Sequence, residues 1–393
     1  MKKLSILFAT ICISISSFAQ DNLVNSLKDN KSEKAKEKFK FTDVKDLEDS
    51  PVKNQGSSGT CWSYSGNSFL ESEMLRMGKP FVDISEIFTA RCAYIERAKN
   101  YVRMHGRIGW GDGAELHDVL EIYKKYGAMP YDQYTGLNYG TTKNKFGEMQ
   151  AALEGFLQGI VKNPNGKLTK NWLPAFTAVL DAYLGKVPEK FMFQGTEYTP
   201  LTFAKQVVEI PVEEYLEIGS FTFAAPYEKT FLMVEDNWSL KEVMNVPMND
   251  LTAIVDNALA KGFTIAWATD VSEKGFSWKN GVAIVPEKDY EEMDEDEKKT
   301  MFDGPQKEKY ITPELREDAF DNYTSTDDHG MHIVGVAKDQ NGKEYYKLKN
   351  SWGDKNDYKG YLYVSKTYFN FKTIAILVHK NVIPAEITKK MKM

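Results

Sequence analysis

Three cysteines and five histidines occur among the 393 residues, and these eight side chains limit the chemistry that the chain can perform. Cys61 has the surroundings that a nucleophilic thiol needs, because a Gly/Ser-rich loop ends and a helical pattern begins at this residue. The reactive species is the thiolate, and a thiol with an ordinary pKa of about 8.5 is mostly protonated at neutral pH. A helix N-terminus stabilises the anion through its dipole and its N–H groups. We therefore expect Cys61 to act as a nucleophile.

The loop before Cys61 supplies groups that suit acyl chemistry. Gly56 and Gly59 allow the backbone to approach a substrate closely. Gln55 offers a side-chain amide upstream of the thiol. Together with the Cys61 N–H, that amide could bind a developing oxyanion, which is worth roughly 3–4 kcal/mol per donor.

The candidate bases lie in a predicted β-hairpin, whose strands at 329–337 and 344–350 flank an Asn-Gly turn. If Ala337 pairs with Glu344, Asn350 shares a sheet face with His329, and His332 points to the opposite face. Asn350 then fixes the His329 ring and completes a Cys–His–Asn arrangement. A slip of one residue would exchange the two histidines, so His332 is the alternative base.

Three blocks resemble the active site of the papain family of cysteine peptidases. They are Gln55-Gly-Ser-Ser-Gly-Thr-Cys61-Trp62, His329-Gly-Met-His-Ile-Val-Gly-Val and Asn350-Ser-Trp352-Gly. The downstream Val-Gly-Val falls in register only with His329, which agrees with the hairpin argument. The resemblance implies a thioester mechanism with Cys61, His329, Asn350 and Gln55 as catalytic residues. We expect Trp352 to shield the His–Asn pair from water and count it with the substrate-binding residues.

Within that superfamily the sequence is similar to the bleomycin hydrolase and bacterial aminopeptidase C family. The segments that carry this similarity are GDGAELHDVLEIYKKYGAMP, EYTPLTFAKQV and IAWATDVSEKGF. The first resembles the family's Asp-Gly-Gly loop, so Gly113 and Ala114 are expected to bind substrate backbone. The resemblance implies an aminopeptidase that acts on peptides and forms a homo-oligomer, such as a hexamer.

Two positions depart from the family pattern. Ser58 stands where secreted papain-like proteases often have a disulfide cysteine. In the aminopeptidase branch the chain end lies in the cleft, and its carboxylate receives the substrate amine. Here the ending HKNVIPAEITKKMKM lacks the family's Pro-Trp-Asp-Pro-Met-Gly. Three alternatives therefore stay open: an endopeptidase without aminopeptidase restriction, a transferase using the same thioester, and a non-enzymatic peptide-binding member of the fold.

The N-terminus has the pattern of a secretory signal peptide over residues 1–19. Lys2 and Lys3 precede an uncharged, largely apolar run, and Ser17-Phe18-Ala19 fits a cleavage site. Cleavage would remove Cys12. We expect an exported protein, periplasmic or secreted, that is not held in a membrane once the signal is cleaved. Residues 20–45 are rich in Lys, Asp, Glu and Ser and are expected to form a solvated arm, with no large pro-segment.

Helical patterns fill the first half of the chain and short apolar strands the second, which predicts an α+β fold. The expected plan is one enlarged papain-like unit, in which a helical half carries the cysteine and an antiparallel β half carries the His/Asn pair. The expected segments are a helical half at 46–140, a mostly helical insertion at 141–245 and a β half at 246–393.

The remaining features point away from other functions. The net charge is −6 and no basic stripe runs along the chain, which disfavours nucleic acid as the main partner. Asp327, Asp328 and the two nearby histidines have no further ligand group close in sequence, so we expect no metal and no cofactor. Cys92 is interpreted as a core residue, and the other histidines, His105, His117 and His379, as surface or structural residues.

Overall fold

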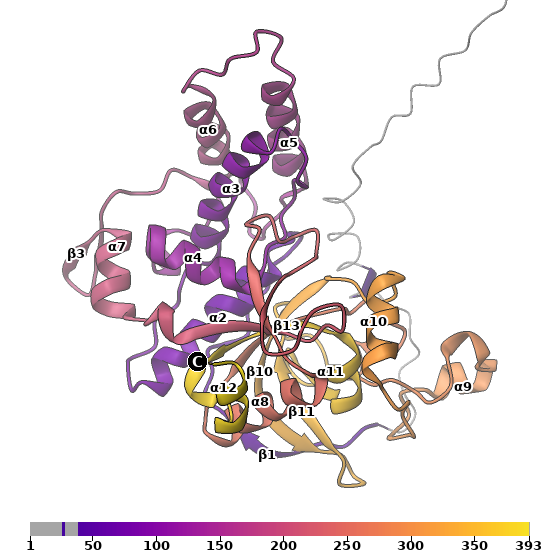
Figure 1. The fold of residues 1–393 in the computed structure, drawn as a ribbon. Helices are drawn as coiled ribbons and strands as arrows, with labels where there is room; N and C mark the ends of the chain where they lie inside the picture. Colours follow the sequence, from indigo (N-terminus) through magenta and orange to yellow (C-terminus); the bar gives the residue numbers. More distant parts are fainter. Residues whose placement is uncertain (1–25, 28–37, 393) are drawn as a thin grey trace, which may run out of the picture.

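A computed structural model describes residues 26–27 and 38–392 of the chain (Figure 1). The expected signal peptide at 1–19 and most of the expected arm lie outside the described residues. Among the helices of the described part, none is both long and apolar enough to cross a bilayer.

The first half of the chain is helical, as predicted. The helix that begins at Cys61 and the helix that ends before Gly127 are confirmed, and Gly127 has the positive φ of 85° that permits this ending. A long helix between them was not predicted. Figure 1 shows the last two helices protruding together from this half. The helices are α2 (Cys61–Arg76), α3 (Glu86–Arg103), α4 (Leu116–Tyr126), α5 (Gly147–Val161) and α6 (Trp172–Leu184).

The second half is built on one sheet in the order β5-β6-β4-β13-β7-β10-β11-β12-β9-β8, with β1 paired to β10. The pairs β4–β6 and β9–β12 are parallel and the other pairs are antiparallel. The strands are β4 (Tyr215–Gly219), β5 (Lys229–Phe231), β6 (Glu242–Asn245), β7 (Ile265–Thr269), β8 (Phe276–Ser277), β9 (Val282–Ala283), β10 (His329–Lys338), β11 (Glu344–Lys349), β12 (Tyr361–Ser365) and β13 (Thr373–His379). A separate hairpin is formed by β2 (Phe191–Phe193) and β3 (Thr196–Tyr198).

Further helices complete the fold. The predicted helix near 246–265 is α8 (Met248–Ala260), and its apolar face is buried as expected at Leu251, Ile254, Val255, Ala258 and Leu259. The shorter helices are α7 (Pro200–Phe203), α9 (Glu295–Thr300), α10 (Pro313–Asp321), α11 (Lys366–Lys372) and α12 (Ala385–Lys390). Short turns of 3₁₀ or π helix join several of these elements.

Two expected segments need correction. The described part of the arm is not simply solvated, because Phe39 is buried and β1 (Thr42–Asp46) adds a strand to β10. The insertion at 141–245 is helical only in its first part, since β4, β5 and β6 belong to the main sheet. These three strands are short or mixed in polarity, so the pattern of a buried strand is weak in the sequence.

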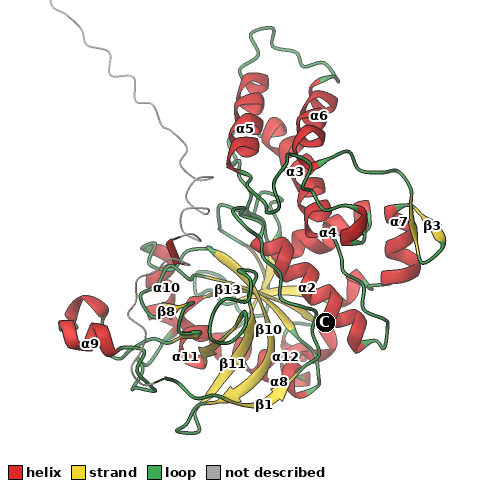
Figure 2. Ribbon diagram, turned by 180° about the vertical axis from the view of Figure 1, so that it is seen from behind, coloured by secondary structure: helices red, strands yellow, loops and turns green. Residues whose placement is uncertain are grey.

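The two halves meet where α2 packs against β10 (Figure 2). Gly330 makes this contact possible, because a Cβ at this position would lie 2.7 Å from Ser65 Oγ and 3.2 Å from Trp62 Cα. The first turn of α2 therefore rests directly on the start of β10. This contact brings the residue that opens the helix next to the residue that opens the strand.

Candidate active site

Cys61 and His329 line one pocket at the junction of the two halves. Cys61 is the first residue of α2 and His329 is the first residue of β10, so each side chain is held by the end of a regular element. Both side chains are buried, with 4% and 2% of their surface exposed. Ala114 also lines this pocket, as the resemblance implied for a substrate-binding residue.

His329 is oriented by Asn350. The ring Nε2 lies 2.8 Å from Asn350 Oδ1. Because an amide oxygen only accepts, Nε2 carries the hydrogen and Nδ1 is left as the basic nitrogen. The ring of Trp352 packs on the histidine with a centroid distance of 4.7 Å, and this tryptophan is itself buried against Phe276 and Trp278. Trp352 thus covers the His–Asn pair, as expected, but it is not among the residues that line the Cys61 pocket.

The hairpin register differs from the prediction near its turn. Ala337 pairs with Tyr345 rather than with Glu344. A β-bulge between Ile333 and Gly335 then shifts the pairing by one residue, so that His332 lies opposite Lys349 as the predicted register requires. A bulge inserts one unpaired residue and carries no reliable mark in the sequence.

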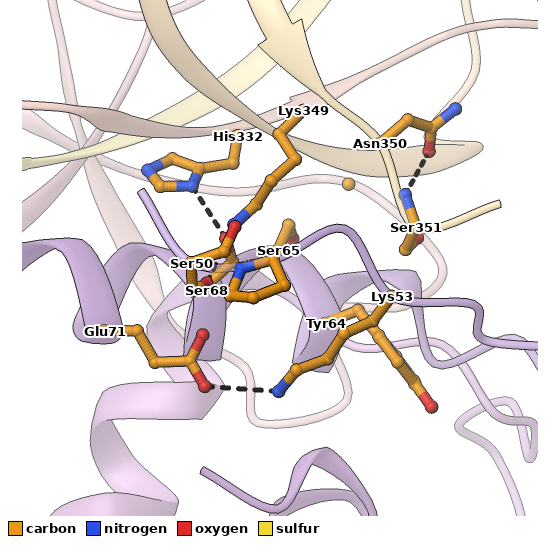
Figure 3. A pocket seen from close by; sticks show the side chains of 12 residues that line it. Ser50, Lys53, Tyr64, Ser65, Ser68, Glu71, His332, Lys349, Asn350 and Ser351 are labelled. Carbon is orange, nitrogen blue, oxygen red and sulfur yellow. Dashed lines mark hydrogen bonds and ion pairs between the residues drawn. The ribbon is translucent and has the colours of Figure 1, made fainter. Parts of the chain in front are cut away.

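His332 belongs to a different cavity (Figure 3). Its ring Nδ1 lies 2.8 Å from Ser68 Oγ, on the second turn of α2, while Figure 3 shows Asn350 turned away from it toward Ser351. Burial lowers the pKa of His332 well below its usual value, and Lys349 adds to this effect. A neutral histidine that faces a serine in the core is a structural residue, so His332 is not placed to serve Cys61.

Gln55 is fully buried beside the same junction. Its Oε1 accepts a hydrogen bond from Ser351 Oγ at 2.5 Å, and its Nε2 donates to the Ser58 carbonyl at 2.7 Å. These contacts fix the amide and leave one N–H of Nε2 for another acceptor. Gln55 does not line the Cys61 pocket, so its role as an oxyanion donor stays a prediction.

Asp112 orders the loop around the thiol, and sequence reasoning did not single it out. Its carboxylate accepts hydrogen bonds from the Gly59 N–H at 2.9 Å and from Tyr94 Oη at 3.1 Å. Its carbonyl accepts from Trp62 Nε1 at 2.9 Å. Asp112 therefore ties the loop that precedes Cys61 to the neighbouring Gly113, which the resemblance assigns to substrate binding.

The pocket is acidic, which the sequence analysis did not predict. Asp236, Asp327 and Asp328 line it together with Cys61. The Asp-Asp pair directly before His329 is visible in the sequence, but the sequence analysis interprets it only in terms of metal binding. Asp236 comes from the loop between β5 and β6, and no sequence motif marks it.

The surroundings of Cys61 disfavour a thiolate that has no cation beside it. Burial raises the pKa of Cys61 to about 12, and the carboxylates of Asp327 and Asp236 add to the rise, whereas backbone groups of Gly330 and Trp62 lower it. A thiolate in such a place needs a cation beside it. A protonated His329 or a positively charged ligand could supply that charge.

Cys92 and His117 have structural surroundings, whereas His105 is exposed. Cys92 is buried inside α3, and neither Cys61 nor Cys92 forms a disulfide. His117 is hydrogen bonded to Glu217 and to Ser239. Burial alone would lower the pKa of His117, but the Glu217 and Asp118 carboxylates raise it to about 9, so this ring is a cation within the core.

Comparison with known proteins agrees with this geometry. Residues 178–393 match the model of the Peptidase C1-like family. The chain is 22% identical over 386 residues to aminopeptidase C of Lactobacillus delbrueckii subsp. lactis, covering 88% of this chain and 82% of that protein. It is 24% identical over 373 residues to aminopeptidase G of the same organism, covering 84% and 80%.

A solved structure shows the same fold. The crystal structure of PepW from Lactobacillus rhamnosis HN001 superposes with a TM-score of 0.70 at 19% identity, and the match covers 89% of this chain and 84% of that one. The expected papain-like α+β fold is therefore confirmed. With a matching family model, a matching fold and a buried cysteine beside a His–Asn pair, the chain belongs to the Peptidase C1-like family.

Proposed function

We propose that this chain is a cysteine aminopeptidase of the bleomycin hydrolase type. The observation that carries the proposal is the pocket that holds Cys61 and His329, with Asn350 hydrogen bonded to the histidine at 2.8 Å. The relatives named above are aminopeptidases, and they match this chain over more than four fifths of its length. Their names support the removal of N-terminal residues from peptides as the reaction.

The first half of the reaction is acylation. Cys61 Sγ attacks the scissile carbonyl after His329 Nδ1 takes the thiol proton. Asn350 Oδ1 holds the Nε2–H and keeps the ring in the tautomer that this transfer requires. The proton then passes from His329 to the departing amine, and a thioester remains on Cys61.

Deacylation uses the same groups. Water gives a proton to His329 and attacks the thioester, and the thiol leaves with that proton. The Cys61 N–H and the remaining N–H of Gln55 are the proposed donors to the oxyanion in both halves. The stacked Trp352 keeps bulk water away from the His–Asn hydrogen bond.

Removal of the thiol tests the peptidase chemistry. We expect Cys61→Ala to abolish hydrolysis of peptide substrates and labelling by a thiol-reactive epoxide. Cys92→Ala is the matched control, because Cys92 is the other cysteine of the described chain and is buried away from the pocket. Hydrolysis that persists in Cys61→Ala at the wild-type rate would end the proposal.

A pair of substrates tests the aminopeptidase restriction. We expect a peptide anilide with a free N-terminal amine to be cleaved with a kcat/KM at least tenfold above that of its N-acetylated form. Equal cleavage of both substrates would instead indicate an endopeptidase on the same catalytic residues.

We also propose that the protein is exported after cleavage near Ala19, on the pattern of residues 1–19. The measurement is the mass and N-terminal sequence of the protein recovered from the producing cells. A chain that keeps Met1 and stays in the cytoplasmic fraction would contradict export.

A further inference from the structure

A group of carboxyls faces the nucleophile across the active-site pocket, and the mechanism above does not use them. Asp236 and Asp327 line the pocket that contains Cys61, and they come from segments far apart in the sequence. The free space in the pocket is about 10 Å³, roughly what one water molecule needs by the same measure. An inference about these groups rests on the proposed aminopeptidase function, because it concerns how the substrate is held.

The Asp236 carboxylate lies directly on the loop that the resemblance assigns to substrate binding. A Cβ at Gly113 would stand only 1.7 Å from Asp236 Oδ2, so the carboxylate lies directly against the backbone at this glycine. The nearest cation is Arg97, whose Nη1 and Nη2 lie 3.4 Å from Asp236 Oδ1. The same guanidinium group also donates to the Gly109 and Gly113 carbonyls. About a quarter of the Asp236 side chain is exposed, so a ligand in the pocket can reach it.

A third carboxyl adjoins this pair. Glu115 is 1% exposed, and its carboxyl lies against that of Asp327. Burial raises the pKa of Glu115 well above its usual value, and the adjacent Asp327 carboxyl is the next largest cause. Burying neighbouring carboxyl groups is costly when they are ionised, and the raised pKa values let this pair hold protons instead.

The cation next to Asp236 is already engaged by the backbone. Arg97 also donates to the Gly109 and Gly113 carbonyls. The carboxyl oxygens also do not converge as metal ligands do, since the cluster with that geometry in the described residues is Glu71, Asp83 and Glu86, which Lys53 occupies. An organic cation that enters the pocket would meet the carboxyl groups of Asp236 and Asp327 on its wall.

We propose that the α-ammonium group of the peptide substrate binds between Asp236 and Asp327, and that these side chains are the amine anchor of this enzyme. The resemblance implied a chain-end carboxylate for this task. Here the described C-terminal helix α12 packs on α8 through Ile387 and Met391, and Lys390 bonds Tyr227. No residue of this described segment lines the Cys61 pocket.

The anchor also couples binding to chemistry. Asp327 and Asp236 both raise the pKa of Cys61, so they oppose formation of the thiolate while they are unpaired. An ammonium group between them neutralises that field, because charges interact strongly in a pocket from which water is excluded. A substrate with a free amine thereby promotes the thiolate that attacks it, and an N-acetylated peptide does not.

The test compares Asp236→Asn with Glu235→Gln. Asparagine keeps the shape of the side chain against Gly113 and removes its charge, whereas Glu235 is an exposed acid on the same loop. For the free-amine anilide we expect kcat/KM to fall at least tenfold in Asp236→Asn, mainly through KM, and to stay within twofold of wild type in Glu235→Gln. For the N-acetylated anilide we expect no loss in either variant.

A second readout moves in the opposite direction. Alkylation of Cys61 by the neutral reagent iodoacetamide, followed by mass spectrometry of the Cys61 peptide, should become faster in Asp236→Asn, because the thiolate is easier to form. Local unfolding would also expose the buried thiol and speed its alkylation, so retained activity on the N-acetylated anilide is the evidence that the variant is folded. Asp327→Asn is the second variant and should show the same pair of changes.

The outcomes separate the anchor from the function. If the wild-type protein prefers the free amine and Asp236→Asn and Asp327→Asn keep that preference, the anchor is wrong and the aminopeptidase function stands. If the wild-type protein cleaves both substrates equally, the aminopeptidase restriction is wrong, and the proposed amine anchor is wrong as well.

Discussion

At the scale of single residues, two histidines three positions apart have opposite surroundings. His329 donates to Asn350 and stands beside the thiol, whereas His332 bonds Ser68 in a separate cavity. Alternation along one strand produces this difference, since neighbouring side chains point to opposite faces. The same type of residue is therefore a base in one position and part of the core in the other.

This contrast gives a matched pair of variants. We expect Asn350→Ala to lower kcat at least tenfold, because the His329 ring loses the Asn350 amide as an acceptor. A net hydrogen bond to a charged group is worth about 1.5–3 kcal/mol. His332→Gln should leave kcat within threefold of wild type. Steady-state kinetics on the free-amine anilide measures both. A larger loss in His332→Gln than in Asn350→Ala would reverse the assignment of the base.

At the scale of elements, the site depends on the contact between α2 and β10. The sequence pattern predicted both elements with their correct first residues, because Cys61 follows a glycine-rich loop and His329 opens an apolar run. The register near the turn was wrong because a bulge lies inside β10. Asp236 could not be found at all, since it reaches the pocket only after the β5–β6 loop has folded over Gly113.

The glycine at this contact can be tested. We expect Gly330→Ala to destabilise the protein by about 1–3 kcal/mol, because the added Cβ would lie 2.7 Å from Ser65 Oγ and 3.2 Å from backbone of α2. The same shift should separate Cys61 from His329 and lower kcat. Urea unfolding and kinetics measure the two effects.

A control for this variant is Gly159→Ala near the C-terminal end of α5, where an added Cβ meets no atom within 4 Å. Alanine is favoured over glycine in a helix by about 1 kcal/mol, so this variant should be slightly more stable and fully active. If Gly330→Ala behaves like Gly159→Ala, the close approach of α2 and β10 is not what positions the site.

At the scale of the whole molecule, the acidic pocket has a cost in stability that depends on pH. Burial raises the pKa of both Glu115 and Asp327 above their usual values, and the Asp236 carboxylate adds to the rise at both. Between about pH 4 and pH 7 the native pair holds protons that the unfolded chain has already lost. Stability falls with rising pH wherever the native state binds more protons, so this pair weakens the fold as the pH approaches neutrality.

Asp327→Asn should remove much of that dependence, because asparagine does not ionise. We expect the variant to resemble wild type in its free energy of unfolding at pH 4 and to be more stable at pH 7.5, while it loses activity on free-amine substrates. Urea unfolding at the two pH values measures the difference, with Asp321→Asn as the control because Asp321 is exposed. A gain in stability that is the same at both pH values would contradict the argument. The expected opposition between stability and activity is that of a site whose charges are arranged for a ligand rather than for the fold.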